Sequence, residues 1–493
     1  MTESSRPADE SVVRVDTVRI PVPHTEMLPG YQALAGRFGR DQVYLLESMA
    51  GPERDTRYQF LGFGVLLTVS ITRSLIRVDG APALRELMRR RIASIVDTSG
   101  EEWRLYDRRD VWTLLRRVQS TFDAEGSKSR FNFGFLAYFG YDTVRYIEDL
   151  PYLIEQDRIR PDIHLVLYQG CVVSDLAEGN SELLLHNSPL WPAQDREEIT
   201  GLLTGAQRAY PIHTVHSMPD SFASSDTEEF TYLANVEKCL KHIAVGDIYQ
   251  VQIGHEWNIH SPVDPVTVYQ RLRDRNASPY MYLTQVGSST VIGASPELFV
   301  RVEDGLVSMR PIAGTAPRGP DDEARAERLR TDPKELAEHV MLVDLCRNDI
   351  GRICQRNTLA VPDQLVVERY SHVLHLVSTV TGHVEEGKDT YDIIAALFPA
   401  GTMTGAPKIR AMEIIEDTER SRRGLYAGAL GLIDVGGYVN LALCIRTLIH
   451  RDGTFRTRAS AGIVADSEPE REWRETLAKV GAGYWAVTGK ELL

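Results

Sequence analysis

Two pairs of glutamates, far apart in the chain, have a spacing that suits a metal site. Glu335 and Glu338 stand three residues apart ahead of the apolar run 340–343, and Glu472 and Glu475 repeat that spacing near the C-terminus. Residues three apart share one face of a helix. Four such carboxylates brought together would repel one another, and a hard divalent cation such as Mg²⁺ would relieve that repulsion. Taken singly, each pair more often marks a solvated helix face.

A second candidate is the turn inside the stretch FPAGTMTGAPKI, residues 398–409. It separates two runs that are compatible with helices, 391–397 and 409–415, and its Pro and Gly residues require a tight, backbone-rich turn. The first turn of a helix favours an anion, to which Thr402 and Thr404 would add hydroxyls and Lys408 a positive charge. Punctuation by Gly and Pro alone more often marks an ordinary junction between helices.

Two basic side chains stand in otherwise apolar stretches. Arg446 interrupts the strand-like segment 441–448, and a buried arginine usually has a carboxylate partner. His375 follows an apolar stripe in the segment 371–376. A lone histidine in such a place is more often a satisfied core residue than a catalytic one.

Bulk composition excludes several classes of function. The chain has 493 residues and a net charge of −14, so it has no basic excess for nucleic acid or for a membrane surface. Its five cysteines are widely spaced and contain no CxxC pair, which fits a reducing cytoplasm. The polar N-terminus shows no signal-peptide pattern, and no apolar run approaches the length of a membrane span. We therefore expect a cytoplasmic protein.

The pattern along the chain predicts an α+β fold with large sheets flanked by helices. Residues 1–12 resemble a disordered start, and 13–210 contain mostly short strand-like runs with one helical interval at 81–95. Residues 211–227 are rich in Pro, Ser, His and Asp and are interpreted as a linker. The remaining region, 228–493, opens with a helix at about 230–243, and then strands alternate with helices.

Several motifs in this second region resemble those of chorismate-utilising enzymes, a family that includes the large component of anthranilate synthase. GTMTGAPK resembles the family signature GTxSGAPK, and PIAGT, SPE and EREWRETLAK are similar to further family motifs. The resemblance covers about residues 230–487, with a weaker match in the first region. It implies the family fold, with large antiparallel sheets flanked by helices, and chorismate as the substrate.

The resemblance also implies roles for individual residues. It makes Glu335, Glu338, Glu472 and Glu475 the ligands of one Mg²⁺ that holds a substrate carboxylate. It makes His375 a catalytic residue, and Arg446 is expected to bind the enolpyruvyl carboxylate. The remaining positions are Thr402 as a catalytic residue and, for substrate binding, Gly314, Thr315, Tyr426, Ser460, Ala461, Gly462 and Lys479.

A candidate inhibitor site comes from two short segments. Leu45-Leu46-Glu47-Ser48 and the segment 276–281 resemble the two halves of the tryptophan feedback site of anthranilate synthase large components. The expected residues are Glu47, Ser48, Pro279, Tyr280 and Met281. The family usually has proline where Ala277 stands. Packing between the two regions would explain the same residues equally well.

Two positions bear on which nucleophile attacks. Relatives that add water carry a lysine base after the glutamine of the strand that follows Gly246-Asp247, and here Val251 follows Gln250. Relatives that form 4-amino-4-deoxychorismate carry a nucleophilic lysine where this chain has Ala313. With these two reactions disfavoured, the reaction that remains is attack of ammonia at C2 of chorismate with loss of the C4 hydroxyl. The chain has no glutaminase signature, so ammonia must come from a separate glutaminase subunit or from solution.

Departures from the family pattern bear on the final product. Ala316 replaces an arginine, Ser460 replaces a glycine, and Gly254-His255-Glu256 replaces the usual SQR. These changes favour a specialised paralogue, as in antibiotic pathways, that releases the aminated intermediate 2-amino-2-deoxyisochorismate, also called 2-amino-4-deoxychorismate. His375, Glu47 and Ser48 are retained, which fits an ordinary anthranilate synthase. An isochorismate or salicylate synthase and a non-catalytic regulatory paralogue are further alternatives, and the oligomeric state stays open.

Overall fold

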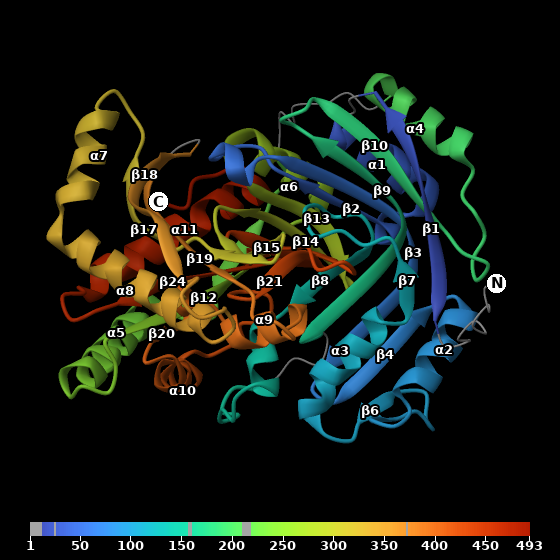
Figure 1. Cartoon of the computed structure of the whole chain (residues 1–493). Coiled ribbons are helices and arrows are strands. Elements are labelled where there is room, and N and C mark those ends of the chain that lie inside the picture. Colours follow the sequence, from blue (N-terminus) through green and yellow to red (C-terminus); the bar gives the residue numbers. More distant parts are fainter. Residues whose placement is uncertain (1–11, 24–25, 156–159, 210–217, 371–372) are drawn as a thin grey trace.

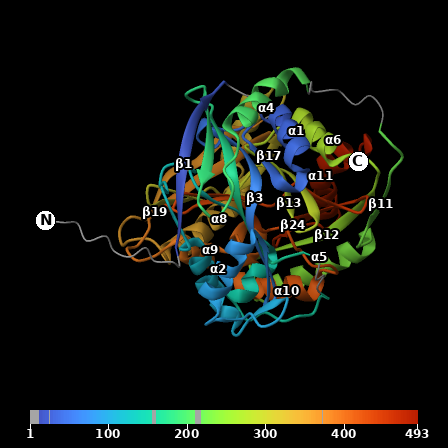
Figure 2. The same ribbon diagram turned by 90° about the vertical axis from the view of Figure 1, so that its right-hand side faces the viewer.

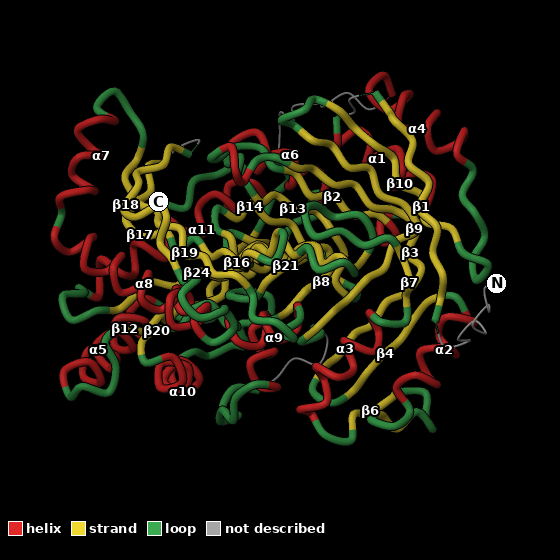
Figure 3. The backbone as a smooth tube through the Cα atoms, in the orientation of Figure 1, coloured by secondary structure: helices red, strands yellow, loops and turns green. Residues whose placement is uncertain are grey.

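The computed structural model describes residues 12–23, 26–155, 160–209, 218–370 and 373–493. The predicted disordered start, 1–12, lies outside these residues except for Val12. Strands run through the middle of the molecule and helices lie on its outside (Figures 1 and 3). All but one of the pairings between the described strands are antiparallel, and the exception joins β1 to β7.

The first region contributes ten strands and four helices among the described residues. Its strands are β1 Val13–Val22, β2 Val43–Glu47, β3 Tyr58–Thr72, β4 Leu75–Gly80, β5 Val96–Asp97, β6 Trp103–Leu105, β7 Phe122–Ala124, β8 Gly134–Phe139, β9 Ile163–Asp175 and β10 Asn180–Asn187. Its helices are α1 Met27–Phe38, α2 Pro82–Ile92, α3 Val111–Gln119 and α4 Arg196–Ala209. Helices α1 and α4 pack side by side on one side of the sheets (Figure 2).

The prediction of a single helical interval before residue 210 is wrong. Helix α2 confirms the interval, but α1, α3 and α4 are additional. Helix α1 contains Pro29 and Gly30, which resemble a turn in the sequence, although Pro29 lies in the first helical turn, where it costs no hydrogen bond. Met27, Tyr31 and Leu34 of α1 are buried, so packing against the sheet fixes the helix there.

The second region contains most of the elements that surround the candidate site. Its strands are β11 Phe222–Ser225, β12 Gln250–His260, β13 Tyr280–Val286, β14 Ser289–Ser295, β15 Leu298–Glu303, β16 Leu306–Met309, β17 Ile312–Pro317, β18 Ala360–Arg369, β19 Val373–His383, β20 Gly405–Ala406, β21 Ala429–Asp434, β22 Val439–Leu443, β23 Thr447–Arg451 and β24 Thr454–Ile463. Its helices are α5 Glu229–Ala244, α6 Pro265–Arg275, α7 Asp322–Thr331, α8 Pro333–Gly351, α9 Thr390–Leu397, α10 Lys408–Thr418 and α11 Pro469–Thr488.

The two regions share sheets. Strand β2 pairs with β13, which places Glu47 opposite Met281, and β8 pairs with β21. Within the predicted linker, 222–225 form strand β11, which pairs with β12, and 211–217 lie outside the described residues. The boundaries 13–210 and 228–493 stay a prediction about the organisation of the chain.

Helices α5, α8, α10 and α11 lie at the end of the molecule that contains β12 and β24, on the left in Figure 1. Helix α11 packs on β24 and α5, α10 packs on β12, and α8 packs on β17 and β19. Apolar residues of α5, α10 and α11 cover one face of β12 and β24. The other face of these strands carries polar side chains and belongs to the candidate site. In the described residues no helix is long and apolar enough to cross a membrane.

Candidate active site

The two glutamate pairs lie on α8 and α11. Helix α8 begins after Asp332, whose carboxylate accepts the N–H groups of Lys334 and Glu335, and Pro333 stands in its first turn. Burial raises the pKa of Glu335, Glu338 and Glu472, and the negative charge of Glu475 raises the pKa of all three further. The carboxylates of the two helices therefore repel one another across a shared space.

This donor set suits Mg²⁺ in its chemistry. Among the described residues, no group of three or more His, Cys, Asp or Glu side chains lies close enough to hold a metal ion. The expected ligands are nevertheless all oxygen anions, and a hard cation would relieve the mutual repulsion that their raised pKa values report. The residues fit the ion, and magnesium binding by these four stays a prediction.

A chain of hydrogen bonds joins α11 to the polar face of β24. Lys479 Nζ donates to Glu475 Oε1 at 2.6 Å and to the Ser460 carbonyl at 2.9 Å. The Ser460 hydroxyl lies 2.5 Å from the Tyr426 hydroxyl and donates to Gln252 Oε1 at 3.0 Å. Three predicted site residues, Tyr426, Ser460 and Lys479, are thus brought together. Gln252 joins them and was not predicted.

Arg446 lies between two strands rather than inside one. The segment 441–448, predicted as one strand, is divided into β22 and β23, and Arg446 has a φ of +52° between them. Its Nη1 donates to the Lys479 carbonyl at 2.9 Å. In the part of the chain that the structure describes, Arg446 forms no ion pair with a carboxylate, and burial lowers the pKa of its guanidinium. A buried cation without an ion-pair partner is suited to an anionic ligand.

His375 on β19 faces the bulged strand β17. Its Nδ1 lies 3.1 Å from Thr315 Oγ1 and 3.3 Å from the Gly314 carbonyl. Burial lowers the pKa of His375 to about 4, so the imidazole is neutral at neutral pH. A proton on Nδ1 satisfies the Gly314 carbonyl and leaves Nε2 as a hydrogen-bond acceptor.

Gly314 brings β17 against the first glutamate pair. Its φ is +66°, and a Cβ added there would lie 3.0 Å from Glu335 Oε2. The position therefore requires glycine both for its backbone conformation and for the space beside the carboxylate. Gly314, Thr315 and His375 thus form one wall, next to the residues expected to bind magnesium.

Glu297, in the SPE motif between β14 and β15, was not predicted as a site residue. Thr402 Oγ1 donates to Glu297 Oε1 at 3.2 Å. Burial raises the pKa of Glu297 to about 8, although the Thr402 hydrogen bond and the charge of Lys479 act in the opposite direction. Glu297 is thus protonated at neutral pH and can donate a proton. The signal in the sequence was the SPE motif itself, to which no role was assigned.

The turn 398–409 contributes one of its three predicted polar groups. The Thr404 hydroxyl is buried and donates to the Ala400 carbonyl at 3.2 Å. Lys408 Nζ lies 2.8 Å from Asp349 Oδ2, so a carboxylate of α8 neutralises its charge. Both side chains are thus already bonded within the protein, and neither is free to bind a ligand anion as the sequence suggested. Thr402 remains, through its contact with Glu297.

Alternation along β12 corrects the argument about the water-activating base. The Val251 side chain is fully buried in the apolar cluster formed with α5, α10 and α11. Gln250 instead points toward the carboxylates, with Nε2 3.5 Å from Glu338 Oε1. The side chain that faces the expected site is therefore that of residue 250 rather than that of residue 251. The conclusion is unchanged, because an amide cannot take a proton from water at neutral pH.

Strand β24 divides its predicted residues between two faces. Ala461 is buried in the same apolar cluster as Val251, so its side chain faces away from the site. Gly462 faces the site, where a Cβ would come within 2.9 Å of the Nε2 atoms of Gln250 and Gln252. Ala316 packs against a separate apolar cluster that includes Leu329 and Leu374.

The five residues of the candidate inhibitor site do lie together. They line a cavity of about 40 Å³ where β2 pairs with β13. The Glu47 carboxylate accepts the Tyr269 hydroxyl at 2.6 Å and Arg273 Nε at 3.1 Å, and the Ser48 hydroxyl donates to the Tyr58 carbonyl. Small-molecule sites usually measure about 300–1,000 Å³. In this conformation the cavity has no room for an indole, and inhibitor binding stays a prediction.

Comparisons with known proteins agree with this arrangement. A family model described as chorismate binding enzyme matches residues 74–483. The chain is 63% identical to 2-amino-4-deoxychorismate synthase of Streptomyces globisporus over 98% of both chains. It is 36% identical to anthranilate synthase component 1 of Acinetobacter calcoaceticus over 90% of both chains.

Solved structures confirm the predicted α+β fold. Anthranilate synthase component I from Streptococcus pneumoniae superimposes with a TM-score of 0.67 at 28% identity, over 87% of this chain and 92% of that one. The isochorismate synthase MenF from Escherichia coli gives a TM-score of 0.67 at 17% identity, over 97% of this chain and 95% of that one. At that identity the second likeness concerns the fold alone.

Proposed function

We infer that this chain, which belongs to the chorismate-binding enzyme family, aminates chorismate at C2 and releases 2-amino-4-deoxychorismate. The observation that carries the inference is the 63% identity over 98% of both chains to 2-amino-4-deoxychorismate synthase. Identity to anthranilate synthase component 1 is 36%. The two relatives named here differ in the product that their names state, so the higher identity favours release of the aminated intermediate.

The amination needs one proton at the leaving group. The lone pair of ammonia forms the new bond at C2, the ring double bonds shift, and the C4 hydroxyl departs as water once it is protonated. Glu297 is protonated at neutral pH, because burial raises its pKa to about 8, and it supplies that proton. The Thr402 hydroxyl, which donates to Glu297 Oε1, orients the carboxyl group.

The charged groups of the site hold the two carboxylates of chorismate. Arg446, which has no carboxylate partner among the described residues, binds the enolpyruvyl carboxylate. Mg²⁺ bound by Glu335, Glu338, Glu472 and Glu475 would neutralise the other carboxylate and the charge that develops on the ring. Lys479 is held toward this region by Glu475 and by the Ser460 carbonyl.

Two features favour release of the aminated intermediate over elimination of pyruvate: the low basicity of His375 and the presence of Ser460. Elimination of pyruvate requires removal of the C2 proton while the enolpyruvyl group leaves. Burial lowers the pKa of His375 to about 4, which makes it a weak base. Ser460 places a hydroxyl, bonded to Tyr426 and Gln252, where the family has glycine. If this hydroxyl shifts the bound intermediate by about 1 Å, elimination slows roughly a hundredfold, and release then precedes it.

The test uses the isolated chain with chorismate, Mg²⁺ and an ammonium salt at alkaline pH. We expect chorismate to disappear without pyruvate or anthranilate fluorescence, and mass spectrometry should identify the aminated product. Pyruvate in equal amount with anthranilate would instead establish the alternative function, anthranilate synthase. Isochorismate formed without ammonia would refute amination.

Two further proposals concern the surroundings of the enzyme. The relatives at 36% identity are named component 1, which implies a second component, and we propose a separate glutaminase subunit as the source of ammonia. All five cysteines are free, and four of them are buried, which supports a reducing, cytoplasmic location.

A further inference from the structure

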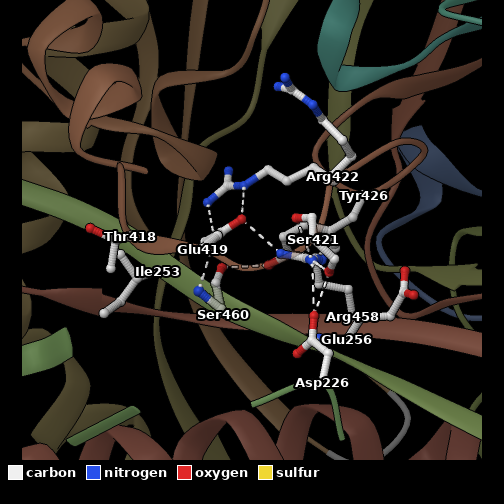
Figure 4. A network of polar contacts seen from close by, with 12 residues as sticks. Asp226, Ile253, Glu256, Thr418, Glu419, Ser421, Arg422, Tyr426, Arg458 and Ser460 are labelled. Atoms are coloured by element: carbon white, nitrogen blue, oxygen red, sulfur yellow. Dashed lines mark hydrogen bonds and ion pairs between the residues drawn. The ribbon is translucent and has the colours of Figure 1, made fainter. Parts of the chain in front are cut away.

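A buried ionic cluster lies directly behind the site, and we call Glu419, Arg423 and Arg458 the inner cluster. Glu419 Oε2 lies 2.7 Å from Arg458 Nη1 and 3.1 Å from Arg423 Nε, while Oε1 lies 2.8 Å from Arg423 Nη2 and accepts the Gly254 N–H at 3.0 Å. Figure 4 shows Glu419 and Arg458 joined beside Ser460 and Tyr426. All three charged side chains are almost fully buried. Such charges persist only when each has its partners.

The inner cluster holds main-chain atoms of two site elements. Arg423 Nη1 donates to the Met403 carbonyl at 2.7 Å, and Met403 follows Thr402 in the turn 398–409. Arg423 Nη2 donates to the Gln252 carbonyl at 2.8 Å, and the Gln252 side chain accepts the Ser460 hydroxyl. One guanidinium therefore sets the distance between the residue that contacts Glu297 and the strand that contacts Ser460.

The third member of the inner cluster reaches the same site from β24. Arg458 stands two residues before Ser460, and besides Glu419 it donates to the Ser421 carbonyl at 2.8 Å. The Arg423 guanidinium also lies 5.7 Å from the centre of the Tyr426 ring. Glu419 thus connects the Thr402 turn, β12, β24 and Tyr426, although within the described part of the chain it forms no hydrogen bond or ion pair with a residue expected to bind substrate.

A second buried cluster of the same chemistry lies nearby, and we call it the outer cluster. Glu416 Oε2 lies 2.7 Å from Arg422 Nη1 and 2.8 Å from Arg145 Nη2. Glu416 Oε1 accepts the main-chain N–H groups of Leu153 and Ile154. Glu416 and Arg422 are as buried as Glu419 and Arg423 to within a few per cent, but these bonds go to the segment 142–154 instead of to the site.

We propose that Glu419 is a positioning residue for the amination, acting through Arg423 to fix the Thr402 turn against β12 and β24. The proposal rests on the proposed function, since it concerns the alignment of the Glu297 proton with the bound substrate. The inner cluster has no contact with the guanidinium of Arg446 or with the Lys479 amine among the described residues. Loss of Glu419 therefore disturbs the reacting geometry more than the binding of the carboxylates, and turnover falls more than affinity.

The experiment compares Glu419→Gln with Glu416→Gln in the full chain, using chorismate, Mg²⁺ and saturating ammonium salt. Both variants lose a buried ion pair, so both should lower the Tm. We expect Glu419→Gln to lower kcat about 10- to 100-fold with KM for chorismate changed less than about threefold, because a misplacement near 1 Å costs about that much. Glu416→Gln should keep kcat within about threefold, since its cluster does not touch the site.

Arg423→Lys and Arg422→Lys form a second matched pair that keeps the buried positive charge. Lysine cannot bridge the Met403 and Gln252 carbonyls with a planar fork, so Arg423→Lys should repeat the loss of kcat and Arg422→Lys should not. If Glu419→Gln does not fold, the comparison of Arg423→Lys with Arg422→Lys tests the proposal in its place. Equal loss of kcat in the inner and outer variants, in proportion to Tm, would overturn the proposal. A wild-type chain that consumes no chorismate would overturn the proposed function itself.

Discussion

The role of Glu297 as proton donor predicts a particular dependence of rate on pH. Burial raises the pKa of Glu297 to about 8, and the reaction requires the protonated form. With that pKa, about nine-tenths of the carboxyl is protonated at pH 7 and about one-tenth at pH 9. The rate should therefore fall about tenfold as pH rises from 7 to 9, because the donor is lost.

The assay must separate this effect from the titration of ammonia. Free ammonia increases with pH, so total ammonium is adjusted to hold the free amine constant, and loss of chorismate is followed at saturating Mg²⁺. Glu297→Gln should lower kcat by about 10²- to 10⁴-fold, the usual contribution of a general acid, and should remove the alkaline limb. The amide keeps the shape of the side chain, so the Tm should change little.

Thr402→Val supplies a control with a definite sign. The Thr402 hydroxyl donates to Glu297 and so favours the ionised carboxylate, which lowers the pKa of Glu297. Removing that donor should raise the pKa and move the alkaline limb to higher pH. A rate that stays constant from pH 7 to 9 at fixed free ammonia, or a Glu297→Gln variant within about tenfold of the wild type, would refute the assignment.

Three other outcomes follow from the site. Glu338→Gln and Glu475→Gln should each lower turnover by orders of magnitude and abolish the increase in Tm that Mg²⁺ produces. Without metal, the Tm of each variant should stay equal to that of the wild type or rise, because repulsion between carboxylates is removed. Near-normal turnover in either variant would place the metal elsewhere. Ser460→Gly combined with Ala316→Arg should release some pyruvate and anthranilate, and unchanged products would exclude Ser460 as the cause of retention. The isolated chain should use ammonium salts but not glutamine alone, and glutamine-dependent product from pure chain would reveal an amidotransferase activity.

Much of the second region could be predicted from its sequence because its elements are locally determined. Helix α5 follows its apolar spacing, and the turn 398–409 lies where Pro and Gly demand it. Glu335 and Glu338 share a face of α8 for the same reason that any residues three apart do. Helix α1 is not predicted from the sequence because Pro29 and Gly30 locally favour a turn. The helix depends instead on tertiary packing, which buries Tyr31 and Leu34 against the sheet.

The site residues that the sequence missed depend on contacts between distant segments. Nothing near Glu297 in the chain indicates a raised pKa, because the pKa is raised by burial in the folded protein, and the hydrogen-bond partner Thr402 lies over a hundred positions away. The left-handed backbone at Arg446 likewise has no local cause in the sequence, since arginine is not a residue that favours positive φ. In the fold this guanidinium donates a hydrogen bond to the Lys479 carbonyl, a contact that the predicted strand conformation does not suggest.

Register along β12 and β24 decides which substitutions can affect the product. Antiparallel pairing sets Ser460 opposite Gly254 and Gly462 opposite Gln252, so these four positions share the site face. The Ser460 side chain has room because Gly254, opposite it, has no side chain. The Ser460 hydroxyl reaches Gln252 along the same face. The glycine at 254 and the serine at 460 are both departures from the family pattern. We infer that they act as a pair, because the glycine leaves the space that the serine side chain occupies. Ser460→Gly alone should remove the 2.5 Å contact between the hydroxyl groups of Ser460 and Tyr426.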